Sequence, residues 1–370
     1  MPNNPLPLDQ VIQGDCIEVM KDFPDRSIDL IFADPPYFLQ LEQQLWRPNR
    51  TKVDGVDDEW DRFSGWENYD RFSRDWLSAC WRILKDTGTI WVIGTYHNIY
   101  RLGAIMQDLG FWFLNDLVWI KTNPMPNFRG VRFTNAHETL IWAAKRKKSR
   151  YTFNYHTMKA LNGGVQMRSD WHLSICNGPE RIRVDGKKVH STQKPESLLY
   201  RILLASSNPG DIVLDPFFGT GTTGAVAKVL HRRWIGIEKE SRYIEFAVSR
   251  IQHTQAEPYS PEVFEVRDVR RRQPRMPFNS LLENGLLKPG QSVYFKGERS
   301  RAAVILPDGR LRIEGFEGTI HQTARHLSGS SPNNGWEVWY FETDQGELAP
   351  IEALREAHRA SLRENPPGKS

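Results

Sequence analysis

Four consecutive residues, Asp34-Pro35-Pro36-Tyr37, form the clearest chemical motif in the chain. They directly follow the apolar run 29–33, and ligand sites of open parallel sheets lie at the carboxyl ends of strands. The two prolines restrict the backbone, so the Asp34 carboxylate and the Pro35 carbonyl become acceptors of fixed direction. Such acceptors suit an aromatic amine, which is a poor nucleophile until both of its hydrogens are bound. Tyr37 adds a flat surface for stacking a base, a contact worth about 1–3 kcal/mol.

A glycine-rich segment, Asp215-Pro216-Phe217-Phe218-Gly219-Thr220-Gly221-Thr222-Thr223, is the second motif. Glycines allow a backbone to approach a cofactor closely. Glu238 ends the next expected strand, near the spacing at which an acidic residue accepts ribose hydroxyls. The string Gly219-x-Gly221-x-x-Gly224 also fits the dinucleotide fingerprint, so a nicotinamide-dependent oxidoreductase remains an alternative. The position of this string argues against a nicotinamide-dependent enzyme, because the dinucleotide fingerprint usually opens its domain and this string comes late in the chain.

Short apolar runs alternate with amphipathic segments over the first 250 or so residues and position these two motifs. The pattern predicts helices at 66–85, 98–109, 196–206 and 222–230, and strands at 90–94, 112–119, 137–144, 211–215 and 234–238. Strands that alternate with helices predict an α/β fold, in which helices cover both faces of a mostly parallel sheet.

A change of composition near His253 predicts a second, smaller module. Prolines interrupt a basic stretch from Pro258 to Pro277 and are typical of a linker. Beyond it, the pattern predicts short strands at 292–295, 302–306, 311–313 and 338–341, a turn at 307–309 and a closing helix at 351–360.

The composition is that of an ordinary globular protein, with 39% hydrophobic and 25% charged residues among 370. The N-terminal residues lack the apolar stretch of a secretory signal, and no segment is long and apolar enough to span a bilayer. The three cysteines, Cys16, Cys80 and Cys176, match neither a disulfide framework nor a zinc site. We therefore expect a cytoplasmic protein that binds no metal.

The net charge of +4 is modest, but its basic residues gather in two stretches. Their members are Arg129, Arg132, Lys145, Arg146, Lys147, Lys148 and Arg150, and then Arg267, Arg270, Arg271, Arg272 and Arg275. Such clusters attract phosphate backbones. A solvated hairpin tip and a linker explain the same charges equally well.

Several motifs of this chain resemble those of the β-group DNA adenine methyltransferases, both in their residues and in their order. The matching strings are Gly14-Asp15-Cys16, Phe32-Ala33-Asp34-Pro35-Pro36-Tyr37, Asn123-Pro124-Met125-Pro126-Asn127-Phe128, Asn135-Ala136-His137-Glu138, Thr192-Gln193-Lys194-Pro195, the glycine segment and Ile235-Gly236-Ile237-Glu238. The catalytic motif precedes the cofactor motif, which is the permuted order of that group. Asn334-Gly335-Trp336 and Leu348-Ala349-Pro350-Ile351 are similar to the cell-cycle-regulated (CcrM-like) subfamily, which modifies adenine in GANTC.

The resemblance implies a Rossmann-like S-adenosylmethionine-dependent methyltransferase fold with a small, mostly β C-terminal domain. It implies a catalytic domain at 1–255 with an inserted target-recognition segment at about 120–190. A linker at 256–275, a DNA-binding module at 276–360 and a disordered tail at 361–370 would follow.

The resemblance also assigns roles to residues of the two motifs. Asp34, Pro35, Pro36 and Tyr37 would hold an adenine that is flipped out of duplex DNA, because its amino group is otherwise unreachable. Asp15 would contact the adenine of S-adenosylmethionine, and Glu238 its ribose. The whole expected cofactor set is Asp15, Cys16, Thr192, Lys194, Asp215, Phe217, Gly219, Gly221, Thr222, Thr223 and Glu238. Packing in the core is the alternative role of Phe217.

Double-stranded DNA is the expected partner, the protein is expected near the nucleoid, and a homodimer is possible. Candidate DNA contacts are Arg47, Asn123, Arg129, Arg132, Asn334 and Trp336. Trp336 is expected on an exposed loop, with burial in a core as the equally weighted alternative. The acidic segment from Leu41 to Phe63, which includes Asp61, is expected to be a mobile loop that orders over DNA.

Two residues depart from the family pattern beside the expected active site. Phe38 replaces the Asn that usually follows the tetrapeptide, and Ser191 replaces the Pro that usually precedes Thr192. Because of these departures, an alternative interpretation of the chain is a catalytically impaired relative that only binds DNA. An RNA or protein amide methyltransferase is a further alternative, although its tetrapeptide more often begins with Asn than with Asp.

Overall fold

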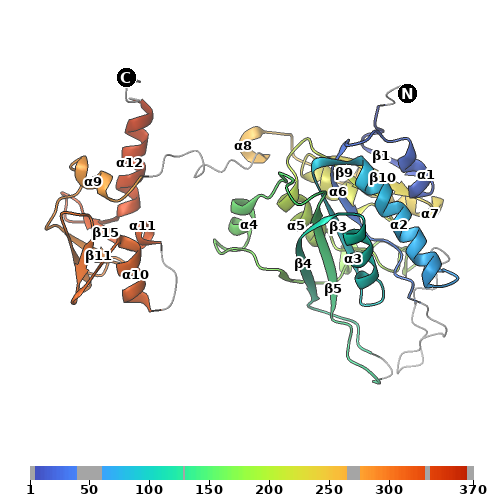
Figure 1. Ribbon diagram of the computed structural model, residues 1–370, viewed down its shortest axis with the longest axis horizontal. Coiled ribbons are helices and arrows are strands. Elements are labelled where there is room, and N and C mark those ends of the chain that lie inside the picture. Colours follow the sequence, from blue (N-terminus) through green and yellow to red (C-terminus); the bar gives the residue numbers. More distant parts are fainter. Residues whose placement is uncertain (1–4, 40–60, 128–129, 265–275, 330–333, 365–370) are drawn as a thin grey trace. The chain divides into compact units, whose positions relative to one another are not determined.

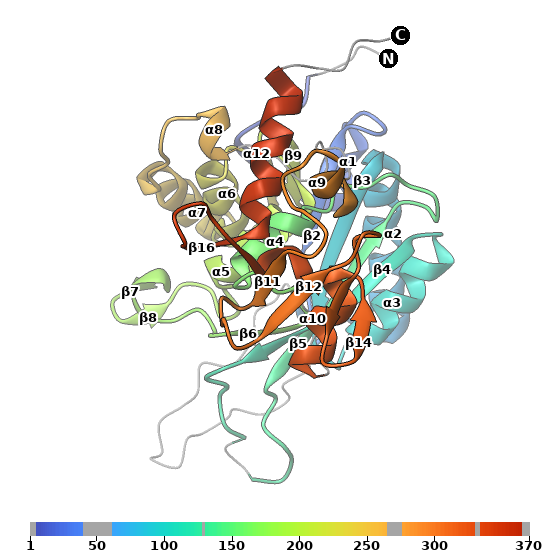
Figure 2. The same ribbon diagram turned by 90° about the vertical axis from the view of Figure 1, so that its left-hand side faces the viewer.

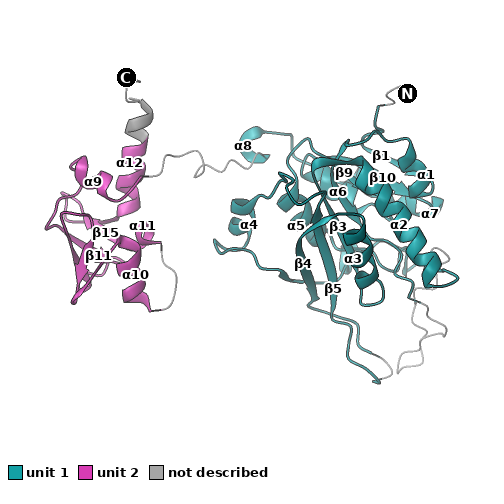
Figure 3. Ribbon diagram, viewed as in Figure 1, with its two compact units in different colours: residues 1–267 teal, residues 268–370 magenta. Residues whose placement is uncertain are grey.

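The computed structural model describes residues 5–39, 61–127, 130–264, 276–329 and 334–364. The chain divides into two compact units, Met1–Arg267 and Asp268–Ser370 (Figure 1, Figure 3). No helix among the described residues is long and apolar enough to cross a membrane.

An eight-stranded sheet forms the centre of the described part of the first unit (Figure 2). Its strands, in spatial order, are β1 (Gln10–Gln13), β10 (Arg233–Glu238), β9 (Ile212–Asp215), β2 (Ile28–Ala33), β3 (Leu84–Gly94), β5 (His137–Ala144), β4 (Trp112–Lys121) and β6 (Asp170–Leu173). Neighbouring strands pair in parallel, except that β5 is antiparallel to both β3 and β4. The expected mostly parallel sheet is confirmed.

Helices cover both faces of this sheet because apolar side chains leave both faces of the central strands. In β2, Ile31 joins one core cluster, whereas Leu30 and Phe32 join the other. The first cluster is closed by α1 (Cys16–Lys21), α2 (Trp66–Ile83) and α3 (Ile99–Asp108). The second is closed by α5 (Glu196–Ser206), α6 (Thr222–Val229) and α7 (Ser241–His253).

Most predicted elements of the first unit are present with small changes at their ends. The strand at 137–144 and the helix at 196–206 have the predicted bounds. β3 begins at Leu84, earlier than predicted, because Leu84 pairs with Ile28 of β2. Elements that were not predicted are β1, α1, α4 (Tyr155–Leu161), β6, the short strands β7 (Arg183–Val184) and β8 (Lys187–Lys188), a 3₁₀ turn at Gly178–Glu180, and α7.

The second unit holds a six-stranded antiparallel sheet within its described residues. Its strands are β11 (Ser292–Phe295), β12 (Ala302–Ile305), β13 (Leu311–Ile313), β14 (Phe316–Gly318), β15 (Trp339–Glu342) and β16 (Leu348–Pro350). The helices α9 (Asn279–Glu283), α10 (Ile320–Ser328), α11 (Gly335–Val338) and α12 (Ile351–Glu364) accompany the sheet. A separate apolar cluster around Phe295 and Trp339 forms its core, and the short helix α8 (Pro261–Phe264) precedes the unit.

Candidate active site

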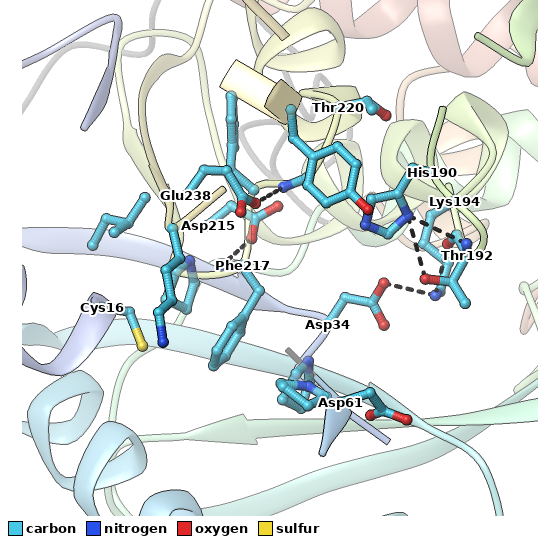
Figure 4. Close-up of a pocket in the computed structure, with 18 of the residues that line it drawn as sticks. Cys16, Asp34, Asp61, His190, Thr192, Lys194, Asp215, Phe217, Thr220 and Glu238 are labelled. Atoms are coloured by element: carbon cyan, nitrogen blue, oxygen red, sulfur yellow. Dashed lines mark hydrogen bonds and ion pairs between the residues drawn. The ribbon is translucent and has the colours of Figure 1, made fainter. Parts of the chain in front are cut away.

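A cavity of about 290 Å³ opens where the parallel strands of the first unit end (Figure 4). Asp15 follows β1, Asp34 follows β2, and Asp215 and Glu238 are the last residues of β9 and β10. Because these strands are parallel, their carboxyl ends meet at one edge, which brings residues far apart in the chain around one space.

Most of the expected site residues line this cavity. They are Asp15, Cys16, Asp34, Pro35, Pro36, Tyr37, Thr192, Lys194, Asp215, Phe217, Gly219, Thr222, Thr223 and Glu238. Gly221 is not among the lining residues. It precedes α6 with φ of 77°, and a side chain there would collide with Ala247.

A buried ionic network surrounds Asp34. Its Oδ2 accepts from Lys194 Nζ at 2.6 Å, and its Oδ1 accepts from the Tyr37 hydroxyl at 2.9 Å. The same hydroxyl lies 3.0 Å from Glu138 Oε2. It has one hydrogen and can donate to only one of the two carboxylates at a time. Glu138 Oε1 pairs with Lys121 Nζ at 2.9 Å, so two carboxylates face two lysines.

Burial and charge act in opposite directions on these groups. Burial raises the pKa of Asp34, and Lys194 offsets that rise only in part. Burial also acts to raise the pKa of Glu138, but Lys194 and Lys121 outweigh it and the pKa is lowered. Burial acts to lower the pKa of Lys194, yet Asp34 and Glu138 raise it. Asp34 is therefore the more basic carboxylate, and Lys194 is a cation.

A second carboxylate holds the loop that carries the tetrapeptide. Asp61 Oδ1 accepts from the backbone N–H groups of Tyr37 at 2.6 Å and Phe38 at 2.7 Å, and its Oδ2 accepts from Leu39 at 2.9 Å. Successive backbone N–H groups that converge in this way form an anion-binding concavity. Asp61 belongs to the segment expected to be a mobile loop that orders over DNA, and its side chain is buried and bound on both oxygens. The ordering over DNA stays a prediction. Residues 40–60 of that segment lie outside the described residues.

Phe38 packs where the family pattern has Asn. Its φ is 53°, a left-handed conformation that favours Asn over bulky side chains. The buried ring contacts Phe63, Trp66 and Tyr69, with centroids 5.5, 4.8 and 5.8 Å away. Aromatic packing thus replaces the polar contacts that an Asn could make.

The glycine loop and the acidic strand end bind one another. Gly219, with φ of 53°, donates its N–H to Glu238 Oε2 at 2.7 Å, and Glu240 N–H donates to Oε1 at 2.8 Å. Each carboxylate oxygen retains a lone pair, so Glu238 can still accept hydroxyls from the cavity side. Asp15 uses its Oδ1 to cap α1 by accepting from Ile17 N–H at 2.9 Å.

Other residues of the expected cofactor set shape the cavity wall. Asp215 accepts from Thr223 Oγ1 at 2.6 Å and from Phe217 N–H at 3.0 Å. The Phe217 ring packs edge-on against Trp76 at 5.2 Å and also lines the cavity, so core packing does not exclude contact with a cofactor. Burial raises the pKa of the Cys16 thiol, which is therefore a wall residue and no thiolate nucleophile.

These features fit S-adenosylmethionine by their chemistry. The cavity offers carboxylates for the ribose hydroxyls and the cationic centre, an aromatic wall, and a loop of small residues that leaves room for the backbone to approach. A side chain on Gly219 would approach His190 Nε2 to 3.4 Å and narrow this space.

Sequence reasoning missed several residues of the site. Asp61, Glu138 and Lys121 carry much of its charge, and only Glu138 belonged to a recognised motif. His190 lines the cavity. Burial, and to a smaller extent the positive charge of Lys194, lowers the pKa of His190 to about 3. Tyr243 packs against His190 with centroids 4.6 Å apart. No local sequence pattern indicates a role for His190 or Tyr243, because only the tertiary structure brings them to the cavity.

The candidate DNA contacts have different outcomes. Arg47 and Arg129 lie outside the described residues. Arg132 is exposed and donates to the Tyr96 hydroxyl at 2.8 Å. Asn123 Oδ1 accepts from Ile175 N–H at 2.9 Å.

The expected exposure of Trp336 is wrong. Its side chain is 6% exposed and belongs to the core of the second unit, beside Phe278 and under the guanidinium of Arg355. Asn334 caps α11 by accepting from Trp336 N–H at 3.3 Å, which begins the helix and turns the Trp336 ring inward.

One member of the basic stretches is also not available to phosphates. Lys145 is 1% exposed, donates to the Leu84 carbonyl at 2.6 Å and lies over the Trp81 ring. It binds the end of α2 rather than facing solvent.

Comparison with known proteins agrees with this geometry. A family model described as "DNA methylase" matches residues 28–249, and one described as "Restriction Enzyme Adenine Methylase Associated" matches residues 263–364. The chain is 51% identical over 335 residues to the Type II methyltransferase M.HinfI of Haemophilus influenzae, which covers 90% of this chain and 92% of that protein. It is 42% identical over 243 residues to the Type II methyltransferase M2.DpnII of Streptococcus pneumoniae. This match covers 65% of this chain and 89% of that protein.

Solved structures share the fold of the first unit. The M1.HpyAVI complex with S-adenosylmethionine has a TM-score of 0.50 and 26% identity, and covers 65% of this chain and 98% of that chain. The PvuII DNA methyltransferase, described as cytosine-N4-specific, has a TM-score of 0.52 and 22% identity, and covers 68% and 88%. The glycine loop therefore serves a methyltransferase and not a nicotinamide enzyme. The chain belongs to the DNA methylase family, as an adenine-specific DNA methyltransferase that uses S-adenosylmethionine.

Proposed function

We propose that this protein methylates the N6 amino group of an adenine that is flipped out of duplex DNA, within the sequence GANTC. The observation that carries the proposal is the position of Asp34, a half-buried carboxylate of raised pKa that lines the same cavity as the glycine loop. When bound, S-adenosylmethionine supplies a sulfonium methyl group.

Asp34 supplies an acceptor for the amino group. Hydrogen bonding of the amine to Asp34 would localise the lone pair on nitrogen, which makes the nitrogen a better nucleophile. As the N–CH₃ bond forms and the S–CH₃ bond breaks, the nitrogen must lose one proton. The raised pKa of Asp34 makes this carboxylate a suitable acceptor of that proton.

Burial of the site argues for a flipped base. Tyr37 is 6% exposed, and the side chain of Asp34, which lines the cavity, is 15% exposed. A base that remains stacked in a duplex cannot bring its amino group to such a depth, so the nucleotide must leave the helix.

The choice of base and the DNA sequence rest on the motifs. The fold does not decide the base, since PvuII shares it and is described as cytosine-N4-specific. Asp as the first residue of the tetrapeptide favours adenine, and GANTC follows from the resemblance to the cell-cycle-regulated subfamily.

We assign the parts of the chain accordingly. Residues 1–255 would carry catalysis, with target recognition at about 120–190, and the module at 276–360 would bind DNA. The exposed Arg132 and Tyr96 support DNA contact near the end of β3 and the start of β5. A homodimer and an association with the nucleoid belong to the same proposal.

Methylation of defined duplexes tests the function. The protein is mixed with labelled S-adenosylmethionine and a duplex that carries one GANTC site, or a duplex in which the same bases are permuted. We expect N6-methyladenine in the first duplex only. Equal labelling of both duplexes would contradict GANTC, and a labelled cytosine would contradict adenine.

Asp34→Ala tests the role of the carboxylate. We expect methyl transfer to fall at least about a hundredfold, some 2.7 kcal/mol of barrier, because the acceptor for the amine is lost. The Kd for S-adenosylmethionine, measured by calorimetry, should stay within about threefold of the wild type.

Asp34→Asn serves as the matched variant, because it preserves the shape of the side chain and, like Asp34→Ala, leaves Lys194 without its nearest anion. Loss of cofactor binding in Asp34→Asn would show that Asp34 belongs to the cofactor half of the site.

A further inference from the structure

Both oxygens of Asp34 already have a donor in this structure. Tyr37 donates to Oδ1 at 2.9 Å and Lys194 donates to Oδ2 at 2.6 Å. Each oxygen has a second lone pair, but a target amine that approaches Asp34 along the direction of a present donor displaces that donor. This step rests on the proposed function, in which the amine is that of adenine.

Lys194 is the donor that can be exchanged. Its Nζ lies 5.1 Å from the centre of the Tyr37 ring, beside the surface expected to receive the base. The Tyr37 hydroxyl can turn its hydrogen to Glu138, but its oxygen stays beside Asp34, because the backbone N–H groups of residues 37, 38 and 39 bind Asp61 and fix the loop. The lysine side chain is flexible, so its ammonium can move without moving the backbone.

A second carboxylate lies within reach of the displaced ammonium. Lys194 Nζ is 3.9 Å from Glu138 Oε2, and it also donates to the Thr192 carbonyl at 3.2 Å. We propose that Glu138 is a positioning residue that takes over Lys194 when the target amine occupies Asp34. The ammonium would then stay paired throughout, which matters because an unpaired buried charge is strongly unfavourable.

The surroundings of Glu138 suit this role. It lies on β5, opposite Trp119 of β4, and so has a fixed backbone. Its Oε1 is bound by Lys121 at 2.9 Å, which leaves Oε2 directed toward Tyr37 and Lys194. Lys121 and Lys194 keep this carboxylate ionised, since they lower its pKa against the effect of burial.

A purely structural role of Glu138 predicts a different result. In that case its static contacts with Lys121 and the Tyr37 hydroxyl would be its whole role, and the loss of the carboxylate would weaken every DNA complex to the same extent. An exchange of Lys194 is needed only when the base carries an amino group. The difference between a base with the amine and one without it therefore isolates the proposed role.

Glu138→Gln is tested on two duplexes that differ only in whether the target base carries an amino group. One duplex has adenine at the target of GANTC and the other has purine, which lacks the amino group. Binding is measured with the full chain and the cofactor product S-adenosylhomocysteine, and the ratio of the two Kd values cancels the active fraction. We expect Glu138→Gln to weaken the adenine complex about tenfold and the purine complex less than about twofold.

Three further variants sharpen the comparison. Glu138→Asp keeps the charge, and its Kd ratio should lie near that of the wild type even where the fold is less stable. In Lys194→Gln, adding Glu138→Gln should leave the ratio unchanged, because no ammonium remains to be moved. Glu18→Gln removes an exposed carboxylate paired with Lys21 on α1 and should change neither complex.

The outcomes separate the inference from the function on which it rests. Equal weakening of both duplexes by Glu138→Gln, or no weakening of the adenine duplex, overturns the role of Glu138. A wild-type protein that methylates no adenine duplex overturns the proposed function, and the role of Glu138 with it.

Discussion

Asp215 shows how burial sets the chemistry of single residues in this protein. Both of its oxygens accept hydrogen bonds from within the glycine loop, which stabilise its charged form. Burial is nevertheless the larger effect and raises the pKa of Asp215 to about 7. The carboxyl that ends β9 is therefore half protonated near neutral pH, unlike an exposed Asp.

Asp215 should make stability fall as pH rises. Because the pKa of the folded state is raised from 3.8 to about 7, the stabilisation is complete below pH 3.8 and is lost as pH rises through 7. Between pH 5 and 6 the free energy of unfolding of the wild type should fall relative to Asp215→Asn by about 1.4 kcal/mol, and between pH 6 and 7 by about 1 kcal/mol. Urea denaturation of both proteins at pH 5, 6 and 7 measures this difference. A difference that does not change with pH would mean that Asp215 is ionised throughout.

At the scale of elements, the loop after β2 decides how the tetrapeptide is presented. Asp61 binds three successive backbone N–H groups of this loop, and Phe38 inserts its ring among Phe63, Trp66 and Tyr69. The departure from the family pattern at Phe38 is thus accommodated by packing, while Asp34 and Tyr37 keep their contacts.

Phe38→Asn should change the rate of methylation by less than about tenfold, a barrier change under roughly 1.4 kcal/mol. The carboxylate Asp61 still holds the loop backbone in that variant. Stability should fall by about 3–5 kcal/mol, as for other buried Phe truncations. Steady-state methylation of a GANTC duplex and chemical denaturation measure the two effects.

Phe38→Ala provides the matched comparison. Asn tolerates the left-handed φ of 53° better than Ala, so Phe38→Asn should be more stable than Phe38→Ala by about 1 kcal/mol. An inactive wild type whose activity is restored by Phe38→Asn would instead identify this chain as a disabled relative.

At the scale of the whole molecule, the chain combines two units with separate cores. The match to the DNA methylase family covers residues 28–249, and the match to the methylase-associated family covers residues 263–364. Trp336 belongs to the core of the second unit, where Phe278 and Arg355 pack against its ring.

Trp336→Ala should therefore act on stability and not on DNA directly. We expect the free energy of unfolding of the second unit to fall by about 3–5 kcal/mol, because a buried ring leaves a cavity. Denaturation of the full chain, followed by circular dichroism, measures this loss. DNA affinity should match the wild type once it is corrected for the folded fraction.

Leu286→Ala is the control for this variant. Leu286 is 38% exposed in the same unit, so its truncation should change stability by less than about 0.5 kcal/mol. Strongly reduced DNA affinity of a fully folded Trp336→Ala protein would contradict the core role.

Some elements were missed although the sequence carries a signal for them. Thr319 and Gln322 form a capping box at the start of α10, with Thr319 Oγ1 accepting from Gln322 N–H at 3.3 Å. A Thr followed three residues later by Gln is a known helix start, and it could have predicted this helix. The strand β1 has no comparable signal, because it is short and depends on pairing with β10 from the far end of the domain.

The sequence by itself determined the α/β class, most of the described strands, five of the twelve described α-helices, and the two loops that line the cavity, because periodicity and the turn residues Pro and Gly act locally. Only the tertiary structure decided which charges meet. Lys194 reaches Asp34 across 160 residues, Glu138 reaches Tyr37 across 101, and Asp61 binds a loop that precedes it by 24 or fewer. The burial of Trp336 was decided in the same way, by neighbours distant in the chain. Such contacts depend on how strands order themselves within the sheet, and no short stretch of residues encodes that order.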